Sequence, residues 1–169
     1  MKVYDQQFNQ NEWFIVIVFV VFYLVIFFMP RRFSLTTSMT LVLVGIYIGM
    51  LSDHTISIPP FDFYDVNDNS SYQFFDFLTY VMYGPFGYIY CYIYDYYKFR
   101  GFKVLFYMLF WAGIAMLLEY TATKLGVFHY KQGYRLLFSL PIYLGLLSIT
   151  LLYFDILLKR EKNIYFNSN

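Results

Sequence analysis

Long apolar runs, each close to the length of a membrane crossing, limit most strongly how this sequence can fold. The clearest run extends from Trp13 to Met29 without a charged residue. A helix needs about 20 largely apolar residues to cross the hydrocarbon core of a bilayer. Hydrophobic residues make up 60% of the chain and charged residues only 14%, too few to give a soluble domain its usual polar surface. The sequence therefore predicts an all-α fold, a polytopic transmembrane helix bundle.

Five segments fit such crossings, and with their connections they use nearly the whole chain. They cover residues 13–29, 35–51, 74–97, 104–125 and 136–158. We therefore expect a single transmembrane domain over residues 1–169. The longest connection, 52–73, holds Pro59-Pro60 and several Asp and Asn residues, so we expect it to lie in water. The second segment is short and the least secure, which leaves a four-span bundle as the alternative.

Small residues, a proline and a run of tyrosines indicate how the helices pack. Gly45 and Gly49 stand four residues apart, a spacing that permits two helices to approach closely, and we favour packing within the chain over self-association. Gly84-Pro85 interrupts the third segment, where the missing amide hydrogen and the ring predict a kink near mid-membrane. Tyrosines at alternate positions from 88 to 96 would point to all sides of a helix. This pattern predicts a central place for the third segment.

Positive charges are unevenly divided between the two sides of a five-span bundle. One side holds most of the 12 Lys and Arg residues, namely Arg31, Arg32, Lys98, Arg100, Lys103, Lys159, Arg160 and Lys162. The other side holds Lys2, Lys124, Lys131 and Arg135. Because loops rich in Lys and Arg stay in the cytoplasm, this predicts an N-terminus outside and a C-terminus inside (N-out/C-in). The acidic connection 52–73 then lies outside.

Several function classes find no motif in this sequence. It has no G-x-S-x-G, P-loop or G-x-G-x-x-G pattern, so hydrolase, kinase and dinucleotide-binding interpretations have no support. Its single cysteine, Cys91, cannot form an internal disulfide, and His54 and His129 have no partners at metal-ligand spacing. We therefore predict neither a metal nor a cofactor. A net charge of +1, without a basic block, argues against nucleic acid as a partner.

Ionisable side chains inside the predicted spans are the best candidates for chemistry, because a charge is costly to place in lipid. Glu119 lies about six residues before the end of the fourth segment, roughly 9 Å inside it at 1.5 Å per residue. Asp76 enters from the same outer side, at the start of the third segment. We expect one outward-facing pocket that combines these carboxylates with residues of the outer loops. Those residues are His54, Lys124, His129, Lys131, Tyr134 and Arg135.

Two interpretations of this pocket stay open. In the functional one, Glu119, His129 and Asp76 are catalytic candidates that act as acids and bases. The candidates for ligand binding are His54, Lys124, Tyr134 and Arg135. In the structural one, Glu119 locks the bundle by pairing with Lys124 or Arg135, or by accepting tyrosine hydroxyls of the third helix. Asp76 is then an ordinary carboxylate at a helix N-terminus, and we favour this structural interpretation.

One stretch resembles a known pattern. It runs from Leu118-Glu119-Tyr120 through Lys124-Leu125-Gly126-Val127-Phe128-His129-Tyr130 to Gly133-Tyr134 and covers about a fifth of the chain. It resembles small uncharacterised multi-span membrane proteins of spore-forming Gram-positive bacteria, in which a membrane Glu precedes a Gly and an aromatic-rich turn. The same order is also similar to parts of integral-membrane carotenoid cyclases, whose further acidic motifs are missing here. The first resemblance implies a location and a fold rather than a reaction.

Short loops and the lack of a catalytic motif favour a non-enzymatic integral membrane protein. We expect a multi-pass structural or accessory subunit of the bacterial cytoplasmic membrane, in contact with the lipid bilayer and with another membrane protein or a second copy. A first alternative is a membrane-embedded enzyme that acts on a lipid or isoprenoid at the outer leaflet through Glu119 and His129. A second alternative is a small-solute or ion carrier with Gly84-Pro85 as its hinge and Glu119 as its coupling site.

Overall fold

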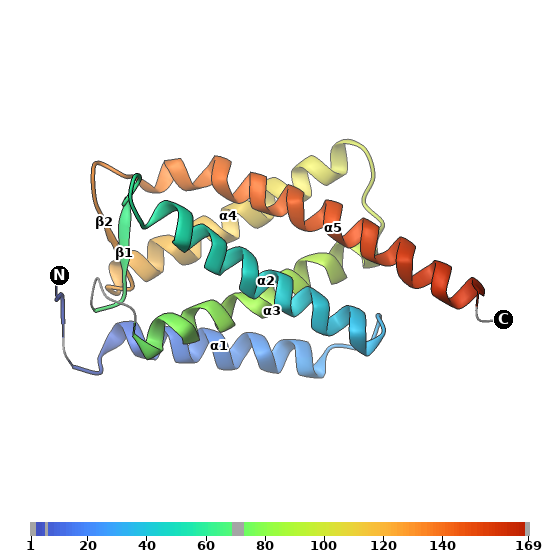
Figure 1. Cartoon of the computed structure of the whole chain (residues 1–169), viewed down its shortest axis with the longest axis horizontal. Helices are drawn as coiled ribbons and strands as arrows, with labels where there is room; N and C mark the ends of the chain where they lie inside the picture. Colours follow the sequence, from blue (N-terminus) through green and yellow to red (C-terminus); the bar gives the residue numbers. More distant parts are fainter. Residues whose placement is uncertain (1–2, 6, 69–72, 168–169) are drawn as a thin grey trace.

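The protein is a bundle of long helices with a very small sheet at one end (Figure 1). A computed structural model describes residues 3–5, 7–68 and 73–167, with side chains described as far as Glu161. The long helices are α1 (Gln10–Phe28), α2 (Leu35–Ile56), α3 (Phe74–Tyr97), α4 (Phe102–Lys124) and α5 (Ser139–Asn167). The other elements are the strands β1 (Tyr64–Val66) and β2 (Phe128–Tyr130) and a short 3-10 turn, η1 (Leu136–Phe138). The predicted all-α helix bundle is confirmed.

Within the described residues, four helical segments are long and apolar enough to cross a membrane. They are α1, α2, α4 and the stretch Leu136–Glu161, which covers η1 and most of α5. Large apolar side chains on their outer faces are exposed, for example Phe28 at 77% and Phe106 at 70%. Lipid tails solvate such surfaces, whereas a soluble monomer rarely exposes apolar patches of this extent. The four segments are therefore compatible with an integral membrane protein.

The helix α3 is the interior helix of the bundle. Its exposed large hydrophobic side chains lie only in its first and last turns, at Phe74, Phe77, Tyr96 and Tyr97. Between these ends it packs against α1, α2 and α5, and its Tyr90 ring stacks on Tyr107 of α4. A helix that faces protein rather than lipid needs no apolar surface all round, which explains why α3 is missing from the four membrane-span segments. The predicted central place of the third segment is confirmed. The least secure of the predicted spans, the second, corresponds to α2, which is apolar enough to cross a membrane.

Glycines bring the backbones of α2 and α3 into direct contact. A side-chain carbon added at Gly45 would lie 2.7 Å from the carbonyl oxygen of Tyr83 and 2.9 Å from that of Gly84. One added at Gly87 would lie 2.9 Å from the carbonyl oxygen of Leu41. The expected role of Gly45 in close packing within the chain is therefore confirmed.

The helix α3 continues without a break through Pro85. Proline has no amide hydrogen, so the carbonyl oxygen of Val81, four residues earlier, loses its usual helical donor. Tyr23 of α1 donates its hydroxyl to this oxygen at 3.0 Å. An unsatisfied carbonyl is costly within a membrane, and this bond between helices replaces the missing one. The kink expected at Gly84-Pro85 stays a prediction.

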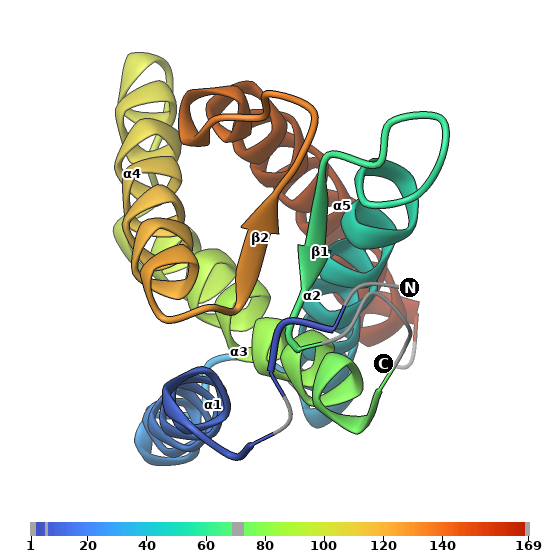
Figure 2. The same ribbon diagram turned by 90° about the vertical axis from the view of Figure 1, so that its left-hand side faces the viewer.

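The two connections α2–α3 and α4–α5 meet at one end of the bundle and pair there as an antiparallel sheet. In its register Tyr64 stands opposite Tyr130, Asp65 opposite His129, and Val66 opposite Phe128. Figure 2 shows these strands crossing the end of the bundle between α4 and α2. We name strands β1 and β2 together the cap sheet. The sequence predicted plain loops here, because strands of three residues are too short to leave a periodic signal.

The α2–α3 contact can be tested with Gly45→Ala. Its methyl group would meet two backbone carbonyl oxygens that cannot turn aside, so we expect the free energy of unfolding in detergent micelles to fall by about 1–3 kcal/mol. Gly113 in α4 is the matched control, because nothing lies within 4 Å of a side-chain carbon added there. In Gly113→Ala, the higher helix propensity of alanine should leave the free energy of unfolding unchanged or raise it. Equal stability of the two variants would contradict the close contact.

Candidate functional site

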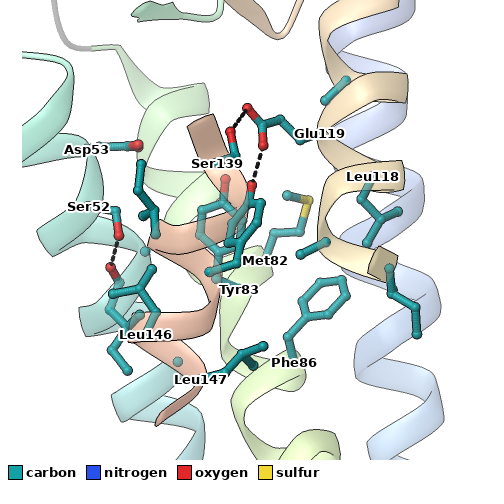
Figure 3. A pocket seen from close by; sticks show the side chains of 18 of the residues that line it. Ser52, Asp53, Met82, Tyr83, Phe86, Leu118, Glu119, Ser139, Leu146 and Leu147 are labelled. Atoms are coloured by element: carbon teal, nitrogen blue, oxygen red, sulfur yellow. Dashed lines mark hydrogen bonds between the residues drawn. The ribbon is translucent and has the colours of Figure 1, made fainter. Parts of the chain in front are cut away.

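A cavity of about 210 Å³ lies among the helices, next to the cap sheet. Side chains of all five long helices line it, and most of them are apolar. Hydroxyl-bearing residues and two acidic residues are the polar members of the lining. Figure 3 shows the acidic residues, Asp53 and Glu119, pointing into the cavity from α2 and α4. This cavity, with its two carboxylates and their partners, is the candidate site.

Glu119 is buried and accepts three hydroxyl groups. Tyr130 and Ser139 each donate to Oε1 at 2.7 Å, and Tyr143 donates to Oε2 at 2.7 Å. These three hydrogen bonds tie α4 to the cap sheet and to α5. These contacts have the form of the lock that the structural interpretation describes. The donors differ from the expected ones, because they come from β2 and α5 rather than from the third helix, Lys124 or Arg135.

Asp53 is a second buried carboxylate, with only 4% of its surface exposed. The expectation that it lies in a water-exposed connection is wrong, because α2 continues past the predicted end at residue 51 to Ile56. Tyr64 donates its hydroxyl to Oδ1 at 2.6 Å. The other oxygen, Oδ2, is buried and has no hydrogen-bond partner among the described residues. The sequence spacing of Asp53 could have predicted that it is buried. Residues four apart share a helix face, so Asp53 continues the face of Gly45 and Gly49 toward α3.

The cap sheet joins the two carboxylates. Tyr64 and Tyr130 stand opposite each other, and directly opposite residues lie on the same face of a sheet. Tyr64 donates to Asp53 on α2, while Tyr130 donates to Glu119 on α4. Burial and the nearby carboxylate raise the pKa of both tyrosines, so both hydroxyls keep their protons at neutral pH. One cross-strand pair therefore links two walls of the cavity.

The other face of the cap sheet points away from the cavity. Successive residues of a strand alternate between its two faces, so Asp65 and His129 lie on the face opposite to Tyr130. Tyr4 covers both of them: its ring stacks on His129 at 3.7 Å and its hydroxyl donates to Asp65 at 2.7 Å. His129 and Glu119 are therefore separated by the sheet, and the structure does not bring these two catalytic candidates together.

A cation holds the outer face of the cap sheet together. Lys131 donates to Asp65 at 2.8 Å and to Asp62 at 2.5 Å. Burial alone would raise the pKa of Asp65, but the bonds from Lys131 and Tyr4 outweigh it and hold that pKa below its ordinary value. Burial likewise opposes the charge of Lys131, yet its two carboxylate partners raise its pKa. Burial and the Asp65 carboxylate raise the pKa of Tyr4 to about 12.

Asp76 belongs to the N-terminal cap of α3, as the structural interpretation expects. Its Oδ2 accepts the backbone amide of Gln73 at 2.6 Å, and its Oδ1 accepts the side-chain amide of Asn67 at 2.6 Å. The backbone amide of Asn67 donates in turn to the carbonyl of Val127 at 2.8 Å. Asp76 therefore anchors the region beside the cap sheet to α3, and it is not among the residues that line the cavity.

The binding candidates do not gather in one pocket. His54, Lys124 and Arg135 are exposed on the surface. Tyr134 lines the cavity, where its hydroxyl lies 2.9 Å from that of Ser139. None of the described residues that line the cavity is His, Lys or Arg. The cavity therefore combines carboxylates with hydroxyls, instead of the expected carboxylates, imidazoles and cations.

The described residues of the cavity offer few groups that could bind a metal or a polar ligand. Within the described ranges, no three His, Cys, Asp or Glu side chains are grouped so that they could hold a metal ion. Glu119 has protein donors on both oxygens, so the described cavity lining keeps one buried acceptor without a partner, Oδ2 of Asp53, and one such donor, Nε1 of Trp111. An apolar cavity with one free acceptor is suited to binding a ligand.

Comparison with known proteins adds no relative. No family model matches the sequence, no curated protein is significantly similar to it, and no solved structure significantly matches its fold. The resemblance to small membrane proteins of spore-forming bacteria therefore stays a prediction. The function has to be inferred from the geometry of the site.

His129 makes the stability of the protein depend on pH. Burial lowers its pKa below the ordinary 6.5, although the carboxylates of Asp65 and Asp68 oppose this shift. The unfolded chain then binds a proton more readily than the folded one, so stability is lost as the pH falls below about 6.5. We expect His129→Phe, which keeps a ring against Tyr4, to lose less stability than the natural chain between pH 7 and pH 5. Thermal unfolding in detergent across this range measures the difference.

The comparison between the two chains separates His129 from other groups. The lowered pKa of Asp65 gives stability that is lost only below about pH 4, outside this range. Groups other than His129 titrate in both chains and cancel in the difference. Parallel pH profiles for the variant and the natural chain would contradict the assignment to His129.

Proposed function

We propose that this chain is a non-enzymatic integral membrane protein of the bacterial cytoplasmic membrane, where it acts as a structural or accessory subunit. The observation that carries the proposal is the full engagement of Glu119. Both of its oxygens accept hydroxyl groups of the protein, whereas a general acid or base must reach a substrate proton. A carboxylate held in this way supports a structural role.

The distribution of positive charge supports the N-out/C-in orientation. The α1–α2 and α3–α4 connections and the end of α5 lie opposite the cap sheet (Figure 1). The described cations of that end are Arg31, Arg32, Lys98, Arg100, Lys103, Lys159 and Arg160. Lys2 and the side chain of Lys162 lie outside the described part of the chain. The positive-inside rule then favours a cytoplasmic location for this end, with the cap sheet and the cavity toward the outside.

The enzymatic alternative receives less support from the geometry. It requires Glu119 and His129 to act on one lipid or isoprenoid substrate, and the cap sheet stands between them. His129 instead stacks on Tyr4. An acid and base that face opposite sides of a sheet cannot share a substrate without rearrangement of the strands.

The carrier alternative also receives less support. It needs α3 to bend at Gly84-Pro85, next to the close contact with Gly45. The bond from Tyr23 to the Val81 carbonyl holds the same turn of α3 to α1. These contacts favour a rigid α3 rather than a hinge.

The structural role of Glu119 can be tested with Glu119→Gln. The change keeps the shape of the side chain but replaces an acceptor oxygen with an amide nitrogen, so at least one hydroxyl loses its acceptor. We expect the free energy of unfolding in detergent to fall by about 1–3 kcal/mol. Chemical unfolding followed by circular dichroism measures this change.

Asp155→Asn is the matched control for this experiment, because Asp155 is an exposed carboxylate on α5. Its stability should stay within about 0.5 kcal/mol of the natural chain. Glu119→Gln protein that keeps its stability while a cellular phenotype disappears would contradict the lock and favour chemistry or transport.

The proposed orientation can be tested by labelling of single cysteines. Cys91, which is fully buried in α3, is first replaced by serine. Cysteines are then placed at Gln132, exposed beside the cap sheet, and at Arg100, exposed at the other end. In intact cells a membrane-impermeant maleimide should label Gln132→Cys and leave Arg100→Cys unlabelled until the cells are opened. The reverse pattern would overturn the N-out/C-in orientation.

A further inference from the structure

The cavity has the size and walls of a site for a small hydrophobic molecule. An engineered apolar cavity of about 150 Å³ holds benzene, and this cavity measures about 210 Å³. It therefore has room for one aromatic ring with a short substituent. Apolar side chains from several helices form most of its walls, among them Val18, Met82, Phe86, Leu118, Leu146 and Leu147.

Two buried polar atoms of described residues that line this cavity are left without a partner, the acceptor Oδ2 of Asp53 and the donor Nε1 of Trp111. Oδ1 of Asp53 accepts the Tyr64 hydroxyl, while Oδ2 is buried and accepts nothing from the described residues. Figure 3 shows Asp53 pointing into the cavity, toward the wall that carries Glu119. A buried acceptor without a donor costs about 1–3 kcal/mol. A ligand that brings a hydrogen-bond donor to Oδ2 would recover this free energy.

The charge of the cavity favours a cationic donor over a neutral one. Two carboxylates line it, and the described lining residues include no His, Lys or Arg. Burial disfavours the charged form of a carboxyl group, and an opposite charge placed beside it favours that form. The rings of Tyr83, Tyr90 and Trp111 also line the cavity, and aromatic faces attract cations.

We propose that the cavity binds a small hydrophobic monoamine, whose ammonium group donates to Oδ2 of Asp53. The apolar part of the ligand packs against the aromatic and aliphatic walls. A bare metal ion fits less well, because one free oxygen in an apolar cavity cannot replace its water ligands. A lipid chain fits the walls but leaves Oδ2 unpaired. This function goes beyond the structural role of Glu119, because it uses Oδ2 of Asp53, which takes no part in the hydrogen bonds of Glu119.

The proposal is tested by comparing 2-phenylethylamine with its neutral isostere, 2-phenylethanol. The purified chain is placed in lipid nanodiscs at neutral pH, and ligand binding is followed by the fluorescence of Trp111, which lines the cavity. The chain has only 2 tryptophans, so Trp13→Phe leaves Trp111 as the sole reporter. We expect the amine to bind at least ten-fold more tightly than the alcohol. Equal affinities would overturn the proposal.

Three variants locate the binding. Asp53→Asn should lose at least ten-fold in affinity for the amine and show no preference over the alcohol. Ala115→Phe, which fills the cavity, should lose both ligands, while Asp155→Asn should bind as the natural chain does. If Asp53→Asn fails to fold, the comparison of ligands and the Ala115→Phe variant still decide. Unchanged binding in Ala115→Phe, or a lipid that co-purifies and is not displaced by the amine, would overturn the proposal.

Discussion

The hydroxyl groups that bond to Glu119 and Asp53 hold the cavity end of this bundle together. A two-stranded sheet of three-residue strands is marginal in isolation, so the cap sheet depends on what anchors it. Tyr64 and Tyr130 provide that anchor, because each donates to a carboxylate on a different helix. In a low-dielectric interior such bonds are strong when complete and costly when incomplete. The position of the cap sheet therefore follows from two acidic side chains in the helices.

The same need to satisfy buried polar groups explains the composition of α3. Its glycines bring it against α2, and its proline frees a carbonyl that a hydroxyl from α1 satisfies. Tyrosine suits this environment because its ring is apolar and its hydroxyl supplies one hydrogen bond. Tyr107 of α4 uses it to donate to the carbonyl of Tyr90 in α3 at 2.5 Å. The interior helix can therefore be rich in tyrosine, while the four apolar segments have a composition compatible with contact to lipid.

The sequence predicted those features that depend on composition and short spacings. The helical bundle, the close approach at Gly45 and the central α3 follow from such patterns. The partners of Glu119 could not be predicted, because they depend on how α5 and β2 turn toward α4. The sequence predicts one pocket for His129 and Glu119 because both are expected on the outer side of the membrane. The alternation of side chains along β2 places His129 and Tyr130, the partner of Glu119, on opposite faces of the cap sheet. A strand of three residues is too short for this alternation to be recognised in the sequence.

The two carboxylates of the cavity differ in a way that separates anchoring from binding. Glu119 has donors on both oxygens, whereas Asp53 keeps one oxygen unpaired. Unsatisfied buried groups are rare in folded proteins, and a ligand or functional role is one of the explanations that such a group calls for. Because Tyr64 and Tyr130 are paired across the cap sheet, a ligand at Asp53 would contact the same sheet that holds Glu119 and α5. The cap sheet is therefore shared by the hydrogen bonds of Glu119 and by the binding site at Asp53. A ligand bound at Asp53 would stabilise the hydrogen bonds of Glu119.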